Sequence, residues 1–333
     1  MDSCMSALKL QTYGDFCVLI VDNGSTDGSA ELLSGYRDRG EAQVLFLPEN
    51  TGFSGAVNAG IRYLLAQPEE PEYIVLLNND TEAEPGYLQA MAEVMEKDTE
   101  KRIGAVSPLM ISMHDRSRID SAGDGYCLLG WAFQRGVGRR TDLPKFEKTT
   151  GVFSACAGAA MYRTEALKQI AFHEAEETWY FDPAHFAYLE DVDVSMRLRI
   201  HGYRIVYEPA SRVCHVGSGT SGSKYNEFKV RLAARNNVWL NCKNLPLILF
   251  LIDLPFILAG VLVKQLFFLF RGFGGAYFKG FWEGVGKLPK ILKHQTYFRF
   301  SRTGNYLRME GKMITDTASY VQDFFCRHLT DKK

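Results

Sequence analysis

The sequence has no excess of charge, no paired-cysteine motif and no secretion signal, and each absence excludes a class of protein. Its 333 residues carry a formal net charge of -1, which gives no reason to expect binding to nucleic acid. The seven cysteines include no Cys-x-x-Cys pair, so we expect no zinc site and interpret them as thiols in a reducing compartment. Residues 1–11 have neither a basic start nor a long apolar core, so we expect the protein to stay on the cytoplasmic side of the membrane.

A clean membrane-spanning segment is also missing, although the C-terminal part is strongly apolar. Residues 245–270 are rich in Leu, Ile and Phe, but Asp253 and Lys264 interrupt them, whereas a spanning helix needs roughly 20 apolar residues. Residues 264–308 hold nine Lys or Arg and one acid. This pattern favours helices that lie on anionic lipid at the cytoplasmic face. A true span or hairpin, and a soluble helical pair that packs on the catalytic part or forms a dimer, remain alternatives.

Three apolar stretches of strand length each end in a polar loop, with helical patterns between them. They are residues 16–21 before Asp22 to Gly28, residues 44–47 before Asn50 to Gly60, and residues 73–77 before Asn78 to Thr81. This rhythm predicts an α/β protein with a doubly wound sheet, in which the continuously apolar stretch 73–77 is an interior, parallel strand. Because open sheets of this kind bind ligands at the carboxyl ends of their strands, Asp22 and Asp80 are candidate ligand contacts.

The surroundings of these two acids differ. Asp22 opens a loop rich in Asn, Asp and Gly, and this stretch alone favours a simple turn with Asp27 as a helix N-cap over a nucleotide contact. The loop also lacks the Gly-Lys-Ser/Thr ending of a Walker loop. Asp80 follows Asn78 and Asn79, whose amide oxygens suit a hard Mg²⁺ or Mn²⁺ ion that carries a diphosphate.

Three acids, Glu190, Asp191 and Asp193, lie within four residues of one another after an aromatic, apolar run. Apolar residues then repeat every four positions up to Ile200, and Gly202 follows. We therefore predict a helix that begins at the acids and ends at a glycine C-cap. The N-terminus of a helix favours an ionised carboxylate, so one of these acids could act as a base. The alternative is that Asp191 or Asp193 merely caps the helix.

Several short motifs follow one another in a fixed order along the chain. They are Val-Asp-Asn-Gly-Ser-Thr-Asp-Gly at 21–28, Asn-x-Gly-x-x-x-Ala-x-Asn-x-Gly at 50–60, Leu-Leu-Asn-Asn-Asp-Thr at 76–81, Gly-Ala-Ala-Met at 158–161, Tyr-Leu-Glu-Asp-Val-Asp at 188–193, Gly-Tyr-Arg-Ile at 202–205, and His215. Together they resemble the family-2 glycosyltransferases of the GT-A fold, most closely the rhamnosyltransferase-like branch, over roughly residues 4–240. Each motif is weak alone, but the ordered set is specific.

The resemblance implies a role for each of these motifs. Asp191, with Glu190 beside it, matches the general base that takes the proton from the acceptor hydroxyl. Asp80 matches the metal-binding acid of an Asp-x-Asp motif, although Asn78 stands where that motif has its first acid, and His215 matches a further ligand of Mg²⁺ or Mn²⁺. The expected donor-binding positions are Asp22, Asn23, Asn50, Gly52, Asn58, Asn79 and Arg235.

These assignments predict an inverting glycosyltransferase of cell-surface polysaccharide synthesis. It would move a rhamnose-like or other hexose from a nucleotide-diphosphate donor to a glycan or lipid-linked acceptor, at the inner face of the cell membrane. The competing hypothesis is a catalytically inactive GT-A domain that serves as a membrane-bound assembly partner. A sugar nucleotidyltransferase is a third hypothesis, but the sequence has no Gly-rich N-terminal loop with Arg or Lys for a triphosphate.

We expect three segments along the chain. Residues 1–243 form the GT-A domain, residues 244–310 form an apolar and basic helical segment that associates with the membrane, and residues 311–333 form a tail. The membrane association is expected to be peripheral, with a single span as the alternative.

One element of the family has no counterpart in this sequence. Residues 1–11 already match the family's first helix, so the strand that the family places between the strands ending at Asp22 and Asp80 is missing. Its absence would leave two rows of backbone N–H and C=O groups unpaired inside the sheet, each group costing on the order of 1–3 kcal/mol. We therefore predict that the natural chain starts upstream of Met1, that this version is inactive, or that a partner supplies a strand.

Overall fold

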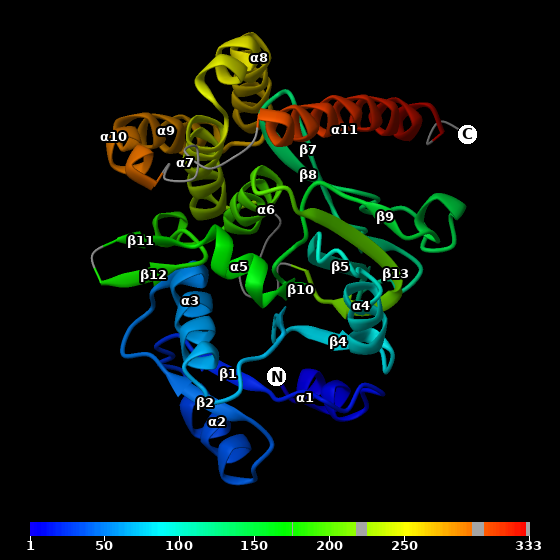
Figure 1. The fold of residues 1–333 in the computed structure, drawn as a ribbon. Coiled ribbons are helices and arrows are strands. Elements are labelled where there is room, and N and C mark those ends of the chain that lie inside the picture. Colours follow the sequence, from blue (N-terminus) through cyan, green and yellow to red (C-terminus); the bar gives the residue numbers. More distant parts are fainter. Residues whose placement is uncertain (175, 218–224, 295–302, 331–333) are drawn as a thin grey trace.

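The chain folds as an α/β protein in which helices cover a mixed sheet, as the sequence predicts (Figure 1). The computed structural model describes residues 1–174, 176–217, 225–294 and 303–330. The elements up to residue 134 are α1 Asp2–Lys9, β1 Leu19–Asp22, α2 Ser29–Asp38, β2 Gln43–Phe46, α3 Gly52–Leu65, β3 Tyr73–Leu77, β4 Thr81–Ala83, α4 Tyr87–Glu96, β5 Ile103–Ser112, β6 Ile119–Ser121, β7 Asp124–Cys127 and β8 Trp131–Gln134. The elements after it are η1 Pro144–Phe146, β9 Thr150–Gly151, β10 Ala159–Arg163, α5 Thr164–Ile170, β11 Phe172–Glu174, β12 Glu177–Trp179, η2 Pro183–His185, α6 Glu190–Ile200, β13 Arg204–His215, α7 Glu227–Asn244, α8 Leu247–Phe270, α9 Gly274–Gly286, α10 Leu288–Ile291, η4 Leu292–His294 and α11 Thr303–Thr330.

The large sheet has seven strands, five of which follow one another in the order β3, β10, β5, β13 and β4. β5 and β13 run parallel, whereas β10 is antiparallel to both of its neighbours and β4 is antiparallel to β13. Nine of the ten residues of β5 are buried, as expected for an apolar strand in the interior of a sheet. β6 and β9 pair with β5 and β13 outside this path.

The strand predicted at residues 73–77 is confirmed as β3, but the prediction that it is interior and parallel is wrong for the described residues. Its one strand partner there is β10, which is antiparallel. β3 is apolar throughout because both of its faces are covered: Ile74 contributes to one hydrophobic cluster, while Tyr73 and Val75 pack on another. Burial on both faces, rather than pairing on both edges, therefore explains its sequence.

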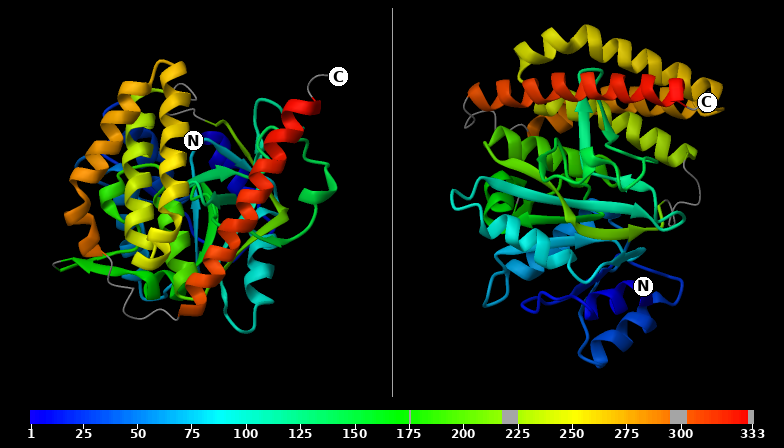
Figure 2. Two further views of the ribbon diagram at one scale, coloured as in Figure 1. Left: turned by 90° about the horizontal axis from the view of Figure 1, so that it is seen from above. Right: turned by 90° about the vertical axis from the view of Figure 1, so that its right-hand side faces the viewer.

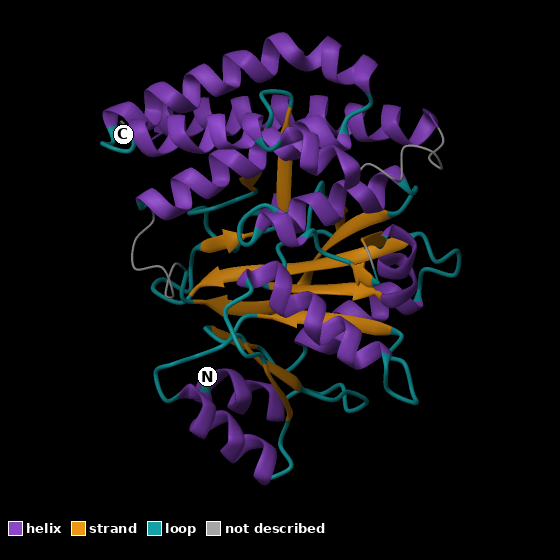
Figure 3. Ribbon diagram, turned by 90° about the vertical axis from the view of Figure 1, so that its left-hand side faces the viewer, coloured by secondary structure: helices purple, strands orange, loops and turns teal. Residues whose placement is uncertain are grey.

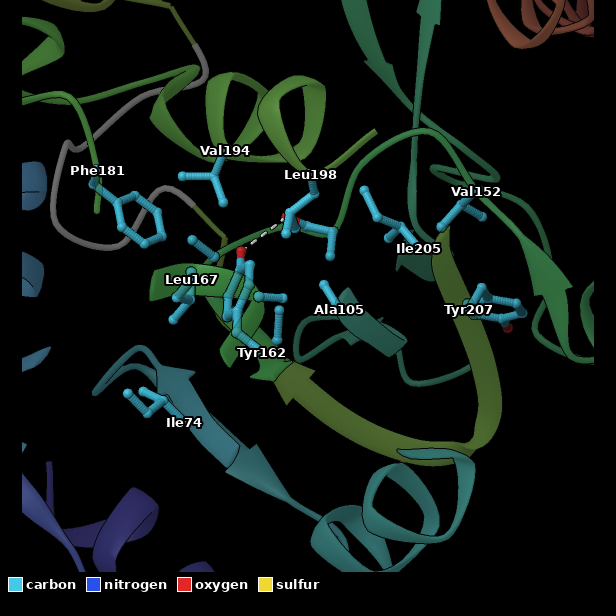
Figure 4. Close-up of a cluster of buried hydrophobic side chains, with 14 of the residues drawn as sticks. Ile74, Ala105, Val152, Tyr162, Leu167, Phe181, Val194, Leu198, Ile205 and Tyr207 are labelled. Atoms are coloured by element: carbon cyan, nitrogen blue, oxygen red, sulfur yellow. Dashed lines mark hydrogen bonds between the residues drawn. The ribbon is translucent and has the colours of Figure 1, made fainter. Parts of the chain in front are cut away.

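The largest hydrophobic cluster lies between the sheet and α6 (Figure 4). Tyr162 from β10 and Tyr207 from β13 belong to it, and Val194 and Leu198 of α6 lie above Tyr162. The other side of α6 packs in a second cluster that includes Met309 and other C-terminal residues. The helix that begins at the three acids is thus held from two sides, and Gly202, with φ of 89°, follows its end as predicted.

The N-terminal strands stand apart from the large sheet. β1 and β2 form a separate parallel pair, in which Asp22 lies opposite Phe46. In the described part of the chain, β1 has no strand on its other edge, and neither does β3. Side chains connect the two sheets instead: α3 places Gly60 against Val21 of β1 and Ile61 in the cluster of the large sheet. The missing interior strand between β1 and β3 remains a prediction.

The C-terminal helices gather on the side of the molecule opposite to α2 (Figures 2 and 3). α7 packs on α9, and α8 packs on α9 as well. α11 runs without a break through residue 310, where the sequence analysis placed a boundary, and Met313 shares a cluster with Met196 of α6. Residues 311–330 of the expected tail are therefore part of a long helix that packs on the rest of the protein. Residues 295–302 of the basic segment lie outside the described residues.

Candidate active site

Asp191 lies in the first turn of α6 with both carboxylate oxygens bound to backbone N–H groups. Oδ1 accepts from Val192 N at 2.8 Å, and Oδ2 accepts from Ala157 N at 3.2 Å. Burial raises the pKa of this carboxyl above its ordinary value, although the two N–H groups act in the opposite direction. The side chain is only partly buried. Asp191 is thus fixed in position, reachable and more basic than an ordinary aspartate, which suits a general base.

Glu190 is the more deeply buried neighbour of this carboxylate. It is 7% exposed, and its Oε2 has no hydrogen-bond partner among the described residues. Burial, with the charge of Asp191 second, raises the pKa of Glu190 to about 8. The structure therefore brings the two predicted catalytic acids together, but it gives the accessible, hydrogen-bonded position to Asp191.

The turn that leads into α6 has a strained backbone. Phe186, Tyr188 and Leu189 all have positive φ, at 63°, 69° and 67°, which L-residues other than Asn and Asp rarely adopt. The amide of Asn236 on α7 donates to the carbonyl oxygens of three residues of this turn, at 2.7–3.1 Å. Arg235 donates to His185 O at 2.8 Å. The turn that positions Asp191 is thus held by a pair of side chains from α7.

This contact set gives Arg235 a different role from the donor binding that the sequence suggested. Its Nε donates to Asn236, and its guanidinium lies 4.4 Å from the centre of the Trp239 ring. The side chain is 8% exposed. Its polar atoms are directed at the protein rather than at a ligand.

Asp193, the third acid of the motif, belongs to a buried ionic network. Lys243 Nζ lies 2.6 Å from Asp182 Oδ2 and 2.7 Å from Asp193 Oδ1, and all three side chains are fully buried. Arg197 pairs with Asp193 at 3.0 Å. Burial alone would raise the pKa of Asp193, but Lys243 and Arg197 lower it to about 2.

The acids of this network, together with His185, do not suit a metal ion. Oxygen and nitrogen atoms of Asp182, His185 and Asp193 lie within 4.8 Å of one another. The ammonium group of Lys243 already bridges the two carboxylates, so a divalent cation would have to displace a buried cation. The network is a structural link between α6, α7 and the turn before α6.

The predicted metal ligands meet at the end of the large sheet. β13 pairs with β4 so that His215 lies opposite Thr81, and Val216 N donates to Asp80 O at 3.1 Å. This pairing brings His215 Nε2 to 3.5 Å from Asp80 Oδ1. Two ligands roughly 2.1 Å from one ion, at an angle of roughly 90–110°, would themselves be roughly 3.0–3.5 Å apart. The observed separation and the N and O atoms therefore fit a shared Mg²⁺ or Mn²⁺ ion.

Asp120, which the sequence analysis did not single out, completes this group. His215 Nδ1 lies 2.8 Å from Asp120 Oδ2, so the histidine is between two carboxylates. Burial lowers the pKa of His215, but the hydrogen bonds to Asp120 and Asp80 outweigh it and raise the pKa to about 9. The hydrogen bond with His215 lowers the pKa of Asp80.

The loops after β1 and β2 are joined by the asparagines of their motifs. Asn23 Oδ1 accepts from Thr51 N at 2.9 Å, and Asn23 Nδ2 donates to Asn50 Oδ1 at 3.1 Å. Asn50 Oδ1 also accepts from Gly52 N at 2.9 Å. Gly52 has φ of 75°, and a Cβ there would lie 2.5 Å from the backbone oxygen of Phe186. Asn23, Asn50 and Gly52, which the sequence predicted to bind the donor, therefore shape a loop that lies against the turn before α6.

The remaining predicted donor residues fall into two groups. Asp22 is 6% exposed at the end of β1, and Asn79 is exposed beside Asp80. Asn58 is fully buried, and its amide makes four hydrogen bonds, two of them to the N–H groups of Tyr180 and Phe181. All of the hydrogen-bonding capacity of Asn58 is used inside the protein, so it joins α3 to a neighbouring segment rather than contacting a nucleotide.

Asp124 is another acid beside Asp191, and the sequence analysis did not predict it as a site residue. Atoms of Asp124, Cys156 and Asp191 lie within 4.8 Å of one another. Asp124 is 8% exposed, and burial, with the charge of Asp191 second, raises its pKa to about 8. Asp124 begins β7 and lies 67 residues from Asp191 in the sequence, so the pair forms only through tertiary contacts.

Comparisons with known proteins show similarity to enzymes that transfer sugars. The profile of a family described as glycosyl transferase family 2 matches residues 1–171. An N-acetylglucosaminyl-diphospho-decaprenol L-rhamnosyltransferase of Mycobacterium tuberculosis is 27% identical over 265 residues, which are 72% of this chain and 81% of that protein. A poly-beta-1,6-N-acetyl-D-glucosamine synthase of Staphylococcus epidermidis is 24% identical over 62% of this chain, which spans 44% of that longer protein.

A solved structure shows the same fold. The crystal structure of GalNAc-T7 with UDP, GalNAc and Mn²⁺ matches with a TM-score of 0.54 and 15% sequence identity, over 71% of this chain and 44% of that one. This likeness concerns the arrangement of helices and strands, and it agrees with the mixed sheet described above.

Proposed function

Because the chain belongs to glycosyl transferase family 2, we propose that it moves a hexose from a nucleotide-diphosphate donor to a glycan or lipid-linked acceptor, with inversion at the anomeric carbon. The observation that carries the proposal is the carboxylate of Asp191, held by two N–H groups at the start of α6 with its pKa raised. The rhamnosyltransferase relative, named for a lipid-diphosphate acceptor, supports a rhamnose-like donor and an acceptor of that kind.

The proposed reaction is a single displacement. Asp191 accepts the proton of an acceptor hydroxyl while that oxygen forms a bond to the anomeric carbon. The bond from that carbon to the diphosphate breaks, and the nucleotide diphosphate leaves with the electron pair. The fixed orientation of the Asp191 carboxylate means that the base need not reorganise during the reaction.

We propose that Asp80 and His215 hold a Mg²⁺ or Mn²⁺ ion at the end of the sheet. Their separation of 3.5 Å and their partial exposure, 21% and 15%, fit a bound ion that can also contact a ligand. Such an ion would neutralise the charge that develops on the leaving diphosphate. The crystallised structural neighbour contains Mn²⁺ together with UDP.

The competing hypothesis of an inactive assembly partner gains no support. The relatives are named as a transferase and a synthase. The hydrogen-bonded carboxylate of Asp191 and the 3.5 Å separation of Asp80 and His215 support the active-enzyme hypothesis instead.

We also propose that α8 attaches the protein to the inner face of the cell membrane without crossing it. α8 is long and apolar enough to span a bilayer. Its two charged residues, however, are on the face that contacts the protein: Asp253 is 2% exposed, and Lys264 Nζ lies 4.8 Å from the centre of the Trp131 ring. A Cβ at Gly260 would lie 2.0 Å from Leu129 O, so the backbone of α8 touches the protein near its middle.

The opposite face of α8 is apolar. Its large exposed side chains are Leu247, Ile248, Leu251, Ile252, Phe256, Leu258, Leu262, Val263, Leu266, Phe267, Leu269 and Phe270. Trp282 and Phe278 of the neighbouring α9 are exposed too. A helix with one face on the protein and one apolar face exposed suits a position in the plane of the membrane surface, because crossing the bilayer would strip its inner face from the protein.

Vesicle flotation tests the attachment. We expect the full chain to float with vesicles that contain phosphatidylglycerol. Replacing three outward residues (L251S, L262S and F270S) should reduce the bound fraction, and unchanged binding of this triple variant would exclude this face. A protease added outside sealed vesicles should reach the chain on both sides of α8, whereas protection of one side would show a span.

A donor screen tests the reaction. The protein is incubated with Mn²⁺, a lipid-linked N-acetylglucosaminyl diphosphate and a set of nucleotide sugars, and transfer is followed by chromatography. We expect transfer from at least one donor, abolished by EDTA and restored by Mn²⁺ or Mg²⁺. Transfer that persists without any metal would overturn the metal assignment, and no transfer from any donor would overturn the proposed acceptor class.

A further inference from the structure

Asp120 is a carboxylate that contacts His215, a proposed metal ligand, through the ring nitrogen that does not face Asp80. It binds His215 through Nδ1, at 2.8 Å, whereas Asp80 faces the other ring nitrogen, Nε2, at 3.5 Å. The two carboxylates therefore lie on opposite sides of one imidazole ring. Nothing in the comparisons or in the motifs of the sequence assigns a function to Asp120.

The pairing of β6, β5 and β13 brings Asp120 and His215 together. Asp120 is the middle residue of β6, whose neighbours Ile119 and Ser121 pair with β5. β5 in turn pairs with β13, so that Ser112 lies opposite His215. Adjacent strands thus fix the backbone positions of Asp120 and His215, although 95 residues separate them in the sequence. The ring is held by the sheet rather than by a loose loop.

A histidine can give a metal only one of its two nitrogens, and the proton on the other decides which one. A carboxylate that accepts the Nδ1 proton leaves the Nε2 lone pair for the ion and fixes the plane of the ring. Partners of this kind typically change metal affinity by about 10–100-fold when they are removed.

We propose that Asp120 is a positioning residue that orients His215 toward the divalent metal and makes its Nε2 a stronger ligand. The inference rests on the proposed metal site of the glycosyltransferase. Asp120 does not touch the ion, so its effect must pass through His215.

The test is a double-mutant cycle on Mn²⁺ binding, measured from the electron paramagnetic resonance signal of free Mn²⁺ with and without UDP or dTDP. We expect D120A to weaken Mn²⁺ binding by about 10–100-fold, and H215A to weaken it at least as much. In the H215A background, the same change at Asp120 should add less than a twofold loss. The amide oxygen of Asn can still accept from Nδ1, so D120N should recover part of the loss.

D115A is the matched control. Asp115 is an exposed carboxylate five residues before Asp120 that bonds to Ser117 within its own loop, so D115A removes a nearby negative charge without touching His215. We expect it to leave Mn²⁺ binding within twofold of the wild type. Melting temperatures are measured for every variant, and if D120A does not fold, D120N and D120S carry the comparison.

The outcomes separate the two proposals. If the wild type fails to bind Mn²⁺ under all of these conditions, the proposed metal site itself is wrong. If the wild type binds and H215A does not, but D120A binds like the wild type, only the role of Asp120 is overturned. A loss from D120A that persists undiminished in the H215A background would show that Asp120 acts directly on the ion, which also contradicts the inference.

Discussion

The half of the molecule that holds the proposed base, Asp191, and the half that carries the loops predicted to bind the donor are built differently. Around Asp191, α6 is buried between the large sheet and the C-terminal helices, and the fully buried Lys243 joins two carboxylates beneath it. Around Asp22, two strands of four residues form a separate pair with partly exposed side chains, joined to α3 by the amide of Asn23.

The difference shows where each half gets its stability. Around Asp191, buried side chains and paired charges hold the structure in place without any ligand. Around Asp22, exposed hydrogen bonds hold the loops, and such bonds contribute little net free energy to folding. We therefore expect the base to be in place before substrates bind, and the donor loops to open locally more often than the core.

The largest effect should come from the base itself. We expect D191N to lower kcat for sugar transfer by about 10²–10⁴-fold, because an amide cannot take the proton of the acceptor hydroxyl. Donor affinity, measured by calorimetry with the nucleotide diphosphate, should change little, because the base acts on the acceptor. If D191N weakened donor binding as much as it lowered kcat, Asp191 would be a donor-binding residue rather than the base that acts on the acceptor.

Breaking the buried ionic network beneath Asp191 should strongly destabilise the protein. We expect K243M to lower the free energy of unfolding by about 3–5 kcal/mol, because it removes the buried ammonium group that bridges Asp182 and Asp193 and leaves Arg197 as the remaining cation beside Asp193. The control is K97M, which breaks an exposed pair with Glu93 and should cost less than about 1 kcal/mol in a urea titration. If the two variants lost similar amounts of unfolding free energy, the buried ion pairs would not be more important for stability than the exposed one.

The acids beside the base should make stability depend on pH. The pKa of Glu190 and that of Asp124 are both raised to about 8 in the folded protein, so the folded state keeps protons that the unfolded state has released. Stability should therefore fall as pH rises from about 4 to about 8. E190Q should gain stability relative to the wild type at pH 8 but not at pH 4, which melting curves across this range would show. A constant difference would mean that Glu190 titrates normally.

The smallest effect is expected in the donor half. N23A removes the amide that binds Thr51 and Asn50, yet these partners are exposed and can bind water. We expect a loss of global stability of about 1 kcal/mol or less, with faster amide hydrogen exchange confined to residues 22–52. Faster exchange in β5 as well would show that the two halves open together.

The sequence was most informative where the pattern is local. Apolar runs ending in polar loops predicted β3, and the acid cluster followed by Gly202 predicted α6 with its terminus. Strand order was not local: the antiparallel pairing of β10 with β3 joins residues far apart in the chain, and no periodicity encodes it.

The site shows the same limit. The motifs singled out Asp80 and His215, which the structure brings to 3.5 Å from each other, and Asp191, which it places at the start of α6; their catalytic and metal-binding roles stay predictions. Asn58 lies in an equally clear motif, and Arg235 was predicted to bind the donor as well, yet tertiary contacts direct the polar atoms of both residues inward. Positive φ at non-glycine residues before α6 runs against local preference, so only the surrounding contacts could produce it.

The most direct test of the central claim is the anomeric configuration of the product, determined by proton nuclear magnetic resonance with the donor found active in the screen. A single displacement with Asp191 as base predicts one product whose configuration is opposite to that of the donor. A product that retains the donor's configuration would contradict the account, because retention requires a different set of steps at the anomeric carbon.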